Sequence, residues 1–217
     1  MQLQVALDRL PLEDALRLAT SIEAYVDWIE VGTSLIKEFG IESVRRMRQA
    51  LPHAQILADV KTNDEARYEF ELCFAARADC ATVMGTAPNA TIQTCMDVAR
   101  EQGKQVMIDL LETGAERQQE LLVYREAIFS VHVSKDVQES SDTGKVPMVS
   151  RLPNWATEYK IAIAGGISLD DIAALGTRLP SLTVIVGSSI TGATDPVVAA
   201  RAFAAALAPY RQRKERP

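Results

Sequence analysis

The sequence predicts an α/β protein built as a single (β/α)8 TIM barrel. Eight short apolar runs recur along the 217 residues, and their starts lie about 26 residues apart, which is room for a strand, a helix and two short loops. The runs are continuously apolar rather than alternating, as expected for parallel strands covered on both faces. The chain length also suits a barrel. A doubly wound open sheet is the alternative, but the Gly-rich turn that it often carries does not follow Asp8.

The expected strands follow one another at regular spacing. In chain order they are LQVALD from Leu3, WIEVG from Trp28, ILADVK from Ile56, CATVMG from Cys80, VMIDLL from Val106, IFSVHV from Ile128, KIAIAGG from Lys160 and LTVIVGS from Leu182. Valine, isoleucine and aromatic residues are enriched in these runs, as in strands.

The segments between the runs predict amphipathic helices. Ala66, Phe70, Cys73 and Ala76 recur at helical spacing between the third and fourth runs. After the eighth run, Asp195-Pro196 predicts an N-cap and a first-turn proline before an Ala-rich helix from Val197 to Leu207. The sixth unit is irregular, because Glu139 to Pro147 is polar. That stretch is either a mobile loop over the site or a weak helix.

Composition and charge exclude several classes of protein. The net charge of −6 and the pI near 5.1 argue against nucleic-acid and anionic-membrane partners. No apolar run approaches the ~20 residues of a membrane span, and the first residues carry no signal-peptide pattern. We therefore expect a cytoplasmic protein with one catalytic domain over residues 1–210 and a charged, disordered tail over 211–217. Its three cysteines lack C-x-x-C spacing and are expected to be buried free thiols.

Charged and polar residues stand at the carboxyl ends of the expected strands, where barrel enzymes place their reactive groups. They are Asp8, Glu30, Asp59 with Lys61, Asp109 with Glu112, and His132. One such residue would usually be a helix cap or a solvated loop residue. Several on successive strands favour a functional site, because ionised groups in a barrel mouth are costly unless they are paired or bound to metal.

The densest cluster is Asp59-Val60-Lys61-Thr62-Asn63-Asp64, a D-x-K-x-x-D pattern. Asp59 and Lys61 are two apart on a strand, so their side chains are expected to point the same way. Asp64 follows the strand and is also placed to cap the next helix. Such carboxylates can hold a divalent metal, and a lysine between them can stabilise developing negative charge.

Two glycine turns predict a phosphate site. Gly165-Gly166 ends the seventh run and Gly187-Ser188 ends the eighth, and these loops are the usual phosphate site of such barrels. Two tight turns without a ligand are the plainer interpretation. His132 is a candidate general acid or base, whereas His53, beside Pro52, is expected to be ordinary surface.

Together these features resemble the orotidine monophosphate decarboxylase suprafamily, in the branch of 3-hexulose-6-phosphate synthase and 3-keto-L-gulonate-6-phosphate decarboxylase. The resemblance covers nearly the whole chain. It is carried by Asp8, Ile29-Glu30-Val31-Gly32-Thr33, the D-x-K-x-x-D pattern, His132 with Asp136-Val137-Gln138, and the two glycine turns.

The resemblance implies a homodimer of barrels with Mg²⁺ at shared active sites and a phosphorylated ketose as substrate. It implies that Glu30 and Asp59 bind the metal, that Asp8 and Lys61 contact the substrate, and that Asp64 reaches into the partner's site. It places phosphate on Gly165, Gly166, Gly187 and Ser188. Both activities of the branch proceed through a 1,2-enediolate of a pentulose phosphate.

The residues favour the synthase over the decarboxylase. Asp109-Leu110-Leu111 and Thr82-Val83-Met84-Gly85 resemble the synthase, whereas the decarboxylase has Glu in place of Asp109 and a phosphate-binding Arg in place of Ser188. Lys135, three after His132, stands where the decarboxylase has an Arg, and is the feature that favours that enzyme. Lys135 and Asp109 are expected to contact substrate. A catalytically silent sugar-phosphate-binding barrel is a remote alternative, which the retained polar set disfavours.

Overall fold

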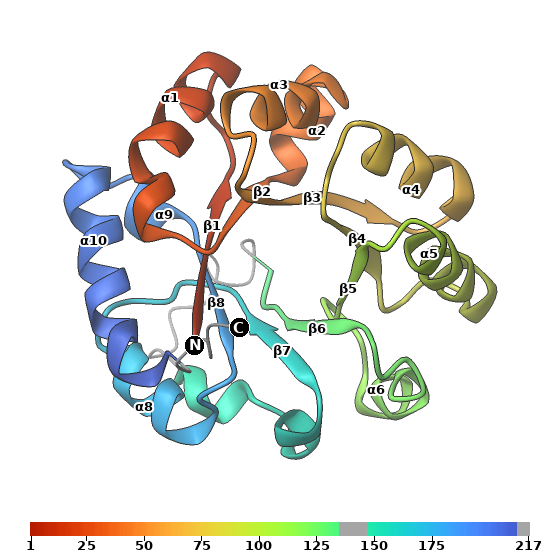
Figure 1. Cartoon of the computed structure of the whole chain (residues 1–217). Helices are drawn as coiled ribbons and strands as arrows, with labels where there is room; N and C mark the ends of the chain where they lie inside the picture. The colour runs from red at the N-terminus through yellow and green to blue at the C-terminus, as the bar shows by residue number, and fades with distance from the viewer. Residues whose placement is uncertain (135–146, 212–217) are drawn as a thin grey trace, which may run out of the picture.

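The structure, a computed structural model, describes residues 1–134 and 147–211 and confirms the predicted barrel. Eight parallel strands close in chain order from β1 to β8, with β1 pairing β8 (Figure 1). The strands are β1 Gln2–Leu7, β2 Trp28–Val31, β3 Gln55–Thr62, β4 Cys80–Met84, β5 Gln105–Asp109, β6 Ile128–Val131, β7 Lys160–Ile163 and β8 Thr183–Val186. All eight predicted runs overlap these strands.

Helices surround the strands in Figure 1. They are α1 Leu12–Ile22, α2 Thr33–Phe39, α3 Glu42–Ala50, α4 Ala66–Ala75, α5 Asn89–Glu101, α6 Ala115–Leu121, α8 Asp171–Arg178, α9 Ser188–Thr191 and α10 Pro196–Leu207. Short 3-10 helices are η1 Glu23–Tyr25, η2 Met148–Arg151, η3 Asn154–Glu158 and η4 Ala208–Tyr210. The predicted cap of α10 is confirmed, because the Asp195 carboxylate accepts hydrogen bonds from the amides of Val197 and Val198.

The irregular sixth unit is followed by the 3-10 helices η2 and η3 before β7. Most of the expected loop at 139–147 lies outside the described residues, as does the tail from 212 onward. Arg211 is described, and its guanidinium lies 3.1 Å from the Asp27 carboxylate.

Two apolar clusters stabilise the barrel. The larger one packs the outward-facing strand residues against the helices. The smaller one lies inside the barrel and consists of Trp28, Leu57, Cys80, Met107, Ala162 and Ile185. Because side chains alternate between the two faces of a strand, the same inward-facing rows continue toward the carboxyl ends as Glu30, Asp59, Thr82 and Asp109. The inner cluster therefore forms a floor beneath these polar residues.

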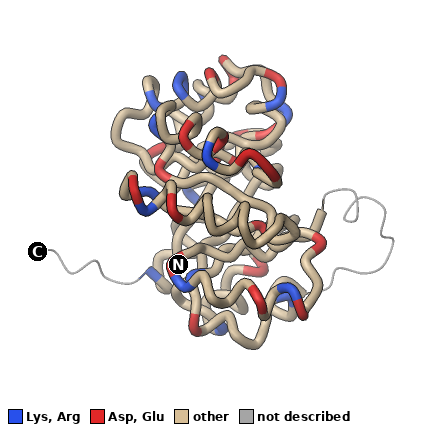
Figure 2. The backbone as a smooth tube through the Cα atoms, turned by 90° about the vertical axis from the view of Figure 1, so that its right-hand side faces the viewer, with Lys and Arg blue, Asp and Glu red and all other residues tan. Residues whose placement is uncertain are grey.

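Acidic and basic residues are interspersed over the helices in the view of Figure 2. No helix among the described residues is long and apolar enough to cross a membrane. The three cysteines are buried free thiols, as the sequence predicts, and His53 is exposed.

Candidate active site

A cavity of about 660 Å³ opens at the carboxyl ends of the strands. It is lined by ten of the residues singled out in the sequence, namely Asp8, Glu30, Asp59, Lys61, Asp109, His132, Gly165, Gly166, Gly187 and Ser188. Because all eight strands are parallel and closed into a barrel, residues up to 180 positions apart converge at this end. The geometry therefore brings most of the predicted site residues together.

Three of the predicted polar residues are not part of this cavity as described. Asp64 is exposed and does not line it; its carboxylate accepts a hydrogen bond of 2.9 Å from the amide of Glu65. The predicted cap by Asp64 is therefore wrong, because Glu65 occupies the N-cap position of α4, in a left-handed conformation. Glu112 is also exposed and outside the cavity. Lys135 lies outside the described residues.

Asp59, in the carboxyl-terminal half of β3, is buried and held from three sides. Thr33 Oγ1 donates to Asp59 Oδ2 at 2.7 Å, and Thr82 Oγ1 donates to Asp59 Oδ1 at 2.9 Å. Lys61 Nζ lies 3.2 Å from the same Oδ1. These contacts come from three strand–loop units, so they fix the carboxylate rather than leaving its rotamer free.

The Lys61 and Asp59 side chains point the same way, as predicted, and they also contact each other. The backbone, however, does not follow simple strand alternation. Lys61 has a φ of 53°, and the register of β3 with β4 shifts between Ala58 and Thr62. The turn brings Lys61 Nζ to 2.6 Å from Asp109 Oδ2 as well. Burial opposes the charge, but the Asp59 and Asp109 carboxylates outweigh it and raise the pKa of Lys61, so the ammonium stays protonated at neutral pH.

Asp109 joins Lys61 to His132. Its Oδ2 lies 3.2 Å from His132 Nδ1, and its Oδ1 accepts from the Leu111 amide at 3.0 Å. Burial alone would raise the pKa of Asp109, but the His132 hydrogen bond and the Lys61 charge lower it to about 2. Asp109 is therefore ionised at neutral pH and favours the tautomer in which His132 Nδ1 carries the proton. That leaves Nε2 of His132 as a proton acceptor.

Asp8 follows β1 and is fixed by the start of α2. Its Oδ1 accepts from the Ser34 amide at 3.0 Å and from Ser34 Oγ at 2.7 Å. The carboxylate lies so close to Gly32 that a Cβ built there would stand 2.3 Å from it. A side chain at this position would therefore displace the Asp8 carboxylate from its contacts. A helix N-terminus is a favourable place for that negative charge.

Glu30 on β2 is buried, and the charge of the Asp59 carboxylate acts on it. Burial, and then the Asp59 charge, raise the pKa of Glu30, against the lowering effect of a hydrogen bond from Gln4. A divalent cation would compensate two adjacent carboxylates, and hard oxygen ligands suit Mg²⁺. The described residues contain no group of three or more His, Cys, Asp or Glu side chains that could hold a metal. The pair fits an ion that keeps waters or substrate oxygens as further ligands.

The phosphate-site turns have the geometry that glycine permits. Gly165 and Gly166 have φ values of 107° and 81°, in the left-handed region. Arg151, at the end of η2, donates to the Gly165 carbonyl at 3.2 Å. After the neighbouring strand β8, α9 begins at Ser188, and Ser189 Oγ donates to the Ile167 carbonyl at 2.8 Å, joining the two turns.

A comparison with protein families finds a match over most of the chain. Residues 1–203 match the Orotidine 5'-phosphate decarboxylase / HUMPS family. The chain belongs to this family.

Similar members of the Orotidine 5'-phosphate decarboxylase / HUMPS family include the 3-hexulose-6-phosphate synthase of Staphylococcus aureus, 35% identical over 95% of this chain and 99% of the relative. The solved 3-hexulose-6-phosphate synthase of Salmonella typhimurium is 34% identical, with a TM-score of 0.86 over 97% of this chain and all of that one. The solved 3-keto-L-gulonate-6-phosphate decarboxylase of Vibrio cholerae is 26% identical, with a TM-score of 0.84 over 97% and 99% of the two chains.

Sequence reasoning did not assign a role to several residues that hold this family member's site. Ser34 binds Asp8, Thr33 and Thr82 bind Asp59, and Gln4 binds Glu30. Thr82 and Gln4 occupy inward-facing strand positions, and that alternation is the signal that could have found them. Ser34 is at the start of a helix after a strand, where a hydroxyl is common for structural reasons alone.

Proposed function

We propose that this chain is a 3-hexulose-6-phosphate synthase, an aldehyde-lyase that reversibly joins D-ribulose 5-phosphate to formaldehyde. The observation that carries the proposal is the hydrogen-bonded row from His132 through Asp109 and Lys61 to Asp59. Asp109 favours the synthase, because the decarboxylase of this branch has a glutamate there. The identity to proteins named 3-hexulose-6-phosphate synthase supports the same choice.

His132 is the proposed base. Since Nδ1 faces the ionised Asp109, Nε2 can take the proton from C1 of ribulose 5-phosphate. The electron pair left on C1 attacks the formaldehyde carbon and forms the new carbon–carbon bond. The formaldehyde oxygen then takes the proton back from His132 and becomes a hydroxyl, which balances the reaction and regenerates the base.

Lys61 and Asp8 are proposed to contact the sugar. The protonated Lys61 lies beside the oxygens on which negative charge develops, and its own carboxylate neighbours fix its position. The Asp8 carboxylate, with Oδ1 engaged by Ser34, can accept from substrate hydroxyls through its other oxygen. The substrate's phosphate is proposed to bind the amides and hydroxyl at Gly165, Gly166, Gly187 and Ser188.

Glu30 and Asp59 are the residues that would hold Mg²⁺. The ion, when bound, would stabilise the negative charge of the enediolate oxygens. We also propose a homodimer with shared sites, in which Asp64 completes the partner's site. Its exposure outside its own cavity supports this assignment. Lys135 is retained as a proposed substrate contact on sequence grounds alone.

A paired assay tests the activity. The purified protein receives ribulose 5-phosphate with formaldehyde in one reaction and 3-keto-L-gulonate 6-phosphate in the other, each with Mg²⁺. We expect kcat/KM to be higher in the first, and EDTA to abolish turnover. A higher kcat/KM in the second reaction would instead identify the decarboxylase, and no turnover in either would reject both enzymes.

Substitution of the base tests the mechanism. His132→Ala is expected to lower kcat by about 10²–10⁴-fold, the usual contribution of a general base, and Lys61→Ala to lower it as severely. Lys104→Ala is the matched control, because Lys104 also pairs with a carboxylate, Asp79 at 2.9 Å, but at the opposite end of the barrel. Near-normal turnover of either site variant would contradict the proposed row.

A further inference from the structure

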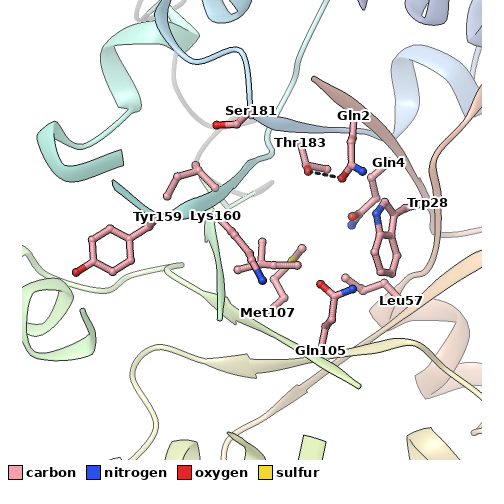
Figure 3. A pocket seen from close by; sticks show the side chains of 12 residues that line it. Gln2, Gln4, Trp28, Leu57, Gln105, Met107, Tyr159, Lys160, Ser181 and Thr183 are labelled. Atoms are coloured by element: carbon pink, nitrogen blue, oxygen red, sulfur yellow. Dashed lines mark hydrogen bonds between the residues drawn. The ribbon is translucent and has the colours of Figure 1, made fainter. Parts of the chain in front are cut away.

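Gln4 is a buried amide in an apolar surrounding. It lies on β1, with 1% of its surface exposed, and is paired in register with Trp28 of β2 and Ile185 of β8. Those two residues belong to the apolar floor of the barrel. Figure 3 shows the Gln4 side chain beside the Trp28 ring. A carboxamide placed there needs a hydrogen-bond partner, because burial of an unpaired amide is unfavourable.

The partner of Gln4 is the proposed metal ligand Glu30. Gln4 Nε2 donates to Glu30 Oε2 at 2.5 Å, and both side chains are buried. Glu30 stands two residues beyond Trp28 on β2, so the Gln4 amide reaches up from the apolar floor into the polar layer. Because Oε2 is engaged from below, Oε1 is the oxygen of Glu30 left for a cation in the cavity.

The two proposed ligands are held very differently. Asp59 is fixed by Thr33, Thr82 and Lys61. Within the described part of the chain, the Glu30 carboxylate has one hydrogen-bond partner, Gln4. A glutamate also has one more rotatable bond than an aspartate. The orientation of Glu30 therefore depends on a single donor.

Gln4 does not line the active-site cavity. It lines a second cavity of about 300 Å³ at the opposite, amino-terminal end of the barrel (Figure 3). Trp28, Leu57 and Met107 line this lower cavity too, and Met107 lines both. Gln4 thus has no access to substrate, and any influence that it has on the reaction passes through Glu30.

We propose that Gln4 is a positioning residue that orients the Glu30 carboxylate toward the metal ion. The inference rests on the proposed Mg²⁺ site. Groups that hold a metal ligand from behind commonly contribute 10–100-fold to metal affinity or activity. The lower cavity gives a substituted side chain room, so the donor can be removed without forcing the floor apart.

The test replaces the donor with a side chain of similar size. Gln4→Met is titrated with Mn²⁺, followed by electron paramagnetic resonance, and with Mg²⁺ by calorimetry, both without substrate. We expect each affinity to fall about 10–100-fold, with the melting temperature recorded on the same samples. Gln4→Asn keeps an amide but is one methylene too short to reach Glu30, and it should lose affinity as well.

Gln2→Met is the matched control. Gln2 is two residues earlier on the same inward-facing row and lines the same lower cavity, but its amide oxygen accepts from Thr183 at 3.3 Å and does not contact Glu30. Its metal affinity should stay within about twofold of the wild type, a change too small for a lost metal contact. An equal loss in Gln2→Met would overturn the proposal in favour of a general packing effect.

Wild-type metal affinity in folded Gln4→Met would also overturn the proposal. So would wild-type metal affinity in Gln4→Asn, even if Gln4→Met loses affinity. Glu30→Gln separates this failure from that of the metal site itself. If Glu30→Gln loses metal and Gln4→Met does not, the site stands and the role of Gln4 is rejected. If Glu30→Gln binds Mn²⁺ as the wild type does, Glu30 is no ligand and both proposals fail.

Discussion

At the scale of single residues, Gly32 matters because the Asp8 side chain packs directly against its backbone. It ends the turn between β2 and α2 with an ordinary extended backbone, φ −68° and ψ 161°. Alanine is therefore permitted by the backbone, but its Cβ would stand 2.3 Å from the Asp8 carboxylate. Because moving a side chain costs less free energy than moving the main chain, the Asp8 carboxylate would shift and lose its hydrogen bonds to Ser34.

Gly32→Ala is accordingly expected to impair activity more than stability. A displacement of about 1 Å can cost about 10²-fold in rate, so we expect kcat/KM to fall about 10–100-fold while the melting temperature changes little. Gly114→Ala is the matched control, because Gly114 has the same N-cap position and backbone, φ −63° and ψ 159°, with nothing near its Cβ. Equal kcat/KM values for the two variants would refute the argument.

At the scale of elements, Asp79 connects three strands and a helix at the amino-terminal end of the barrel. It stands just before β4 and accepts hydrogen bonds from the Ile56 amide of β3 and from Lys104, beside β5. It also pairs with Arg48 of α3, which donates to the carbonyls that follow its own helix. The buried guanidinium is thus satisfied jointly by Asp79 and main-chain oxygens.

Acid titration tests this connection. Burial would raise the pKa of Asp79, but the Ile56, Lys104 and Arg48 contacts outweigh it and lower the pKa below the unfolded value of 3.8. Its stabilising contribution is therefore complete above about pH 4 and lost as the pH falls through the folded pKa. Asp79→Asn should lower the free energy of unfolding by about 1–3 kcal/mol at pH 7.

The deficit of Asp79→Asn should shrink below pH 4, where the wild type loses the same charge. Urea unfolding at pH 7, 5, 4 and 3 measures it. Asp97→Asn is the control, because Asp97 forms an exposed pair with Arg100 on α5 and such pairs contribute little. A deficit that persists unchanged at pH 3 would show that the charge of Asp79 is not its source.

The strands were predictable because each is a continuous apolar run between loops, a pattern that local sequence carries by itself. The ends of the strands were less predictable. The fifth and sixth runs continue to Leu111 and Val133, whereas β5 ends at Asp109 and β6 at Val131. At these points Leu111 and His132 line the cavity, and the partner of His132, Asp109, comes from another strand. The left-handed backbone of Lys61 could not be predicted for the same reason, because its partner Asp109 is 48 residues away.

At the scale of the whole molecule, the closed topology explains why a site could be predicted from residues far apart in sequence. Parallel strands bring all their carboxyl ends to one rim, so Asp8, Asp59 and His132 needed only to be assigned to strand ends. The contacts of Gln4 and Ser34 could not be assigned in that way. They depend on the register between β1 and β2 and on the direction of each side chain, which one sequence does not specify.

Assembly can be tested with two variants that are each inactive. If sites are shared, a dimer of one Lys61→Ala and one Asp64→Ala subunit carries one intact site and one doubly altered site. Random exchange of equal amounts should restore about a quarter of the wild-type activity, because half of the dimers are mixed and each has one working site. Verified exchange without recovery would contradict shared sites, and an active Asp64→Ala protein would remove Asp64 from the site.

The lower cavity of about 300 Å³ has a consequence for how this barrel can change. The floor of the active site is one layer of side chains with space beneath it, not a solid interior. Larger apolar residues at the amino-terminal end, for example in place of Thr183 or Gln105, could fill that space and add stability from the side opposite the chemistry. Stability and catalysis are then adjustable from opposite ends of one barrel, and Gln4 is the position where the two adjustments would interfere.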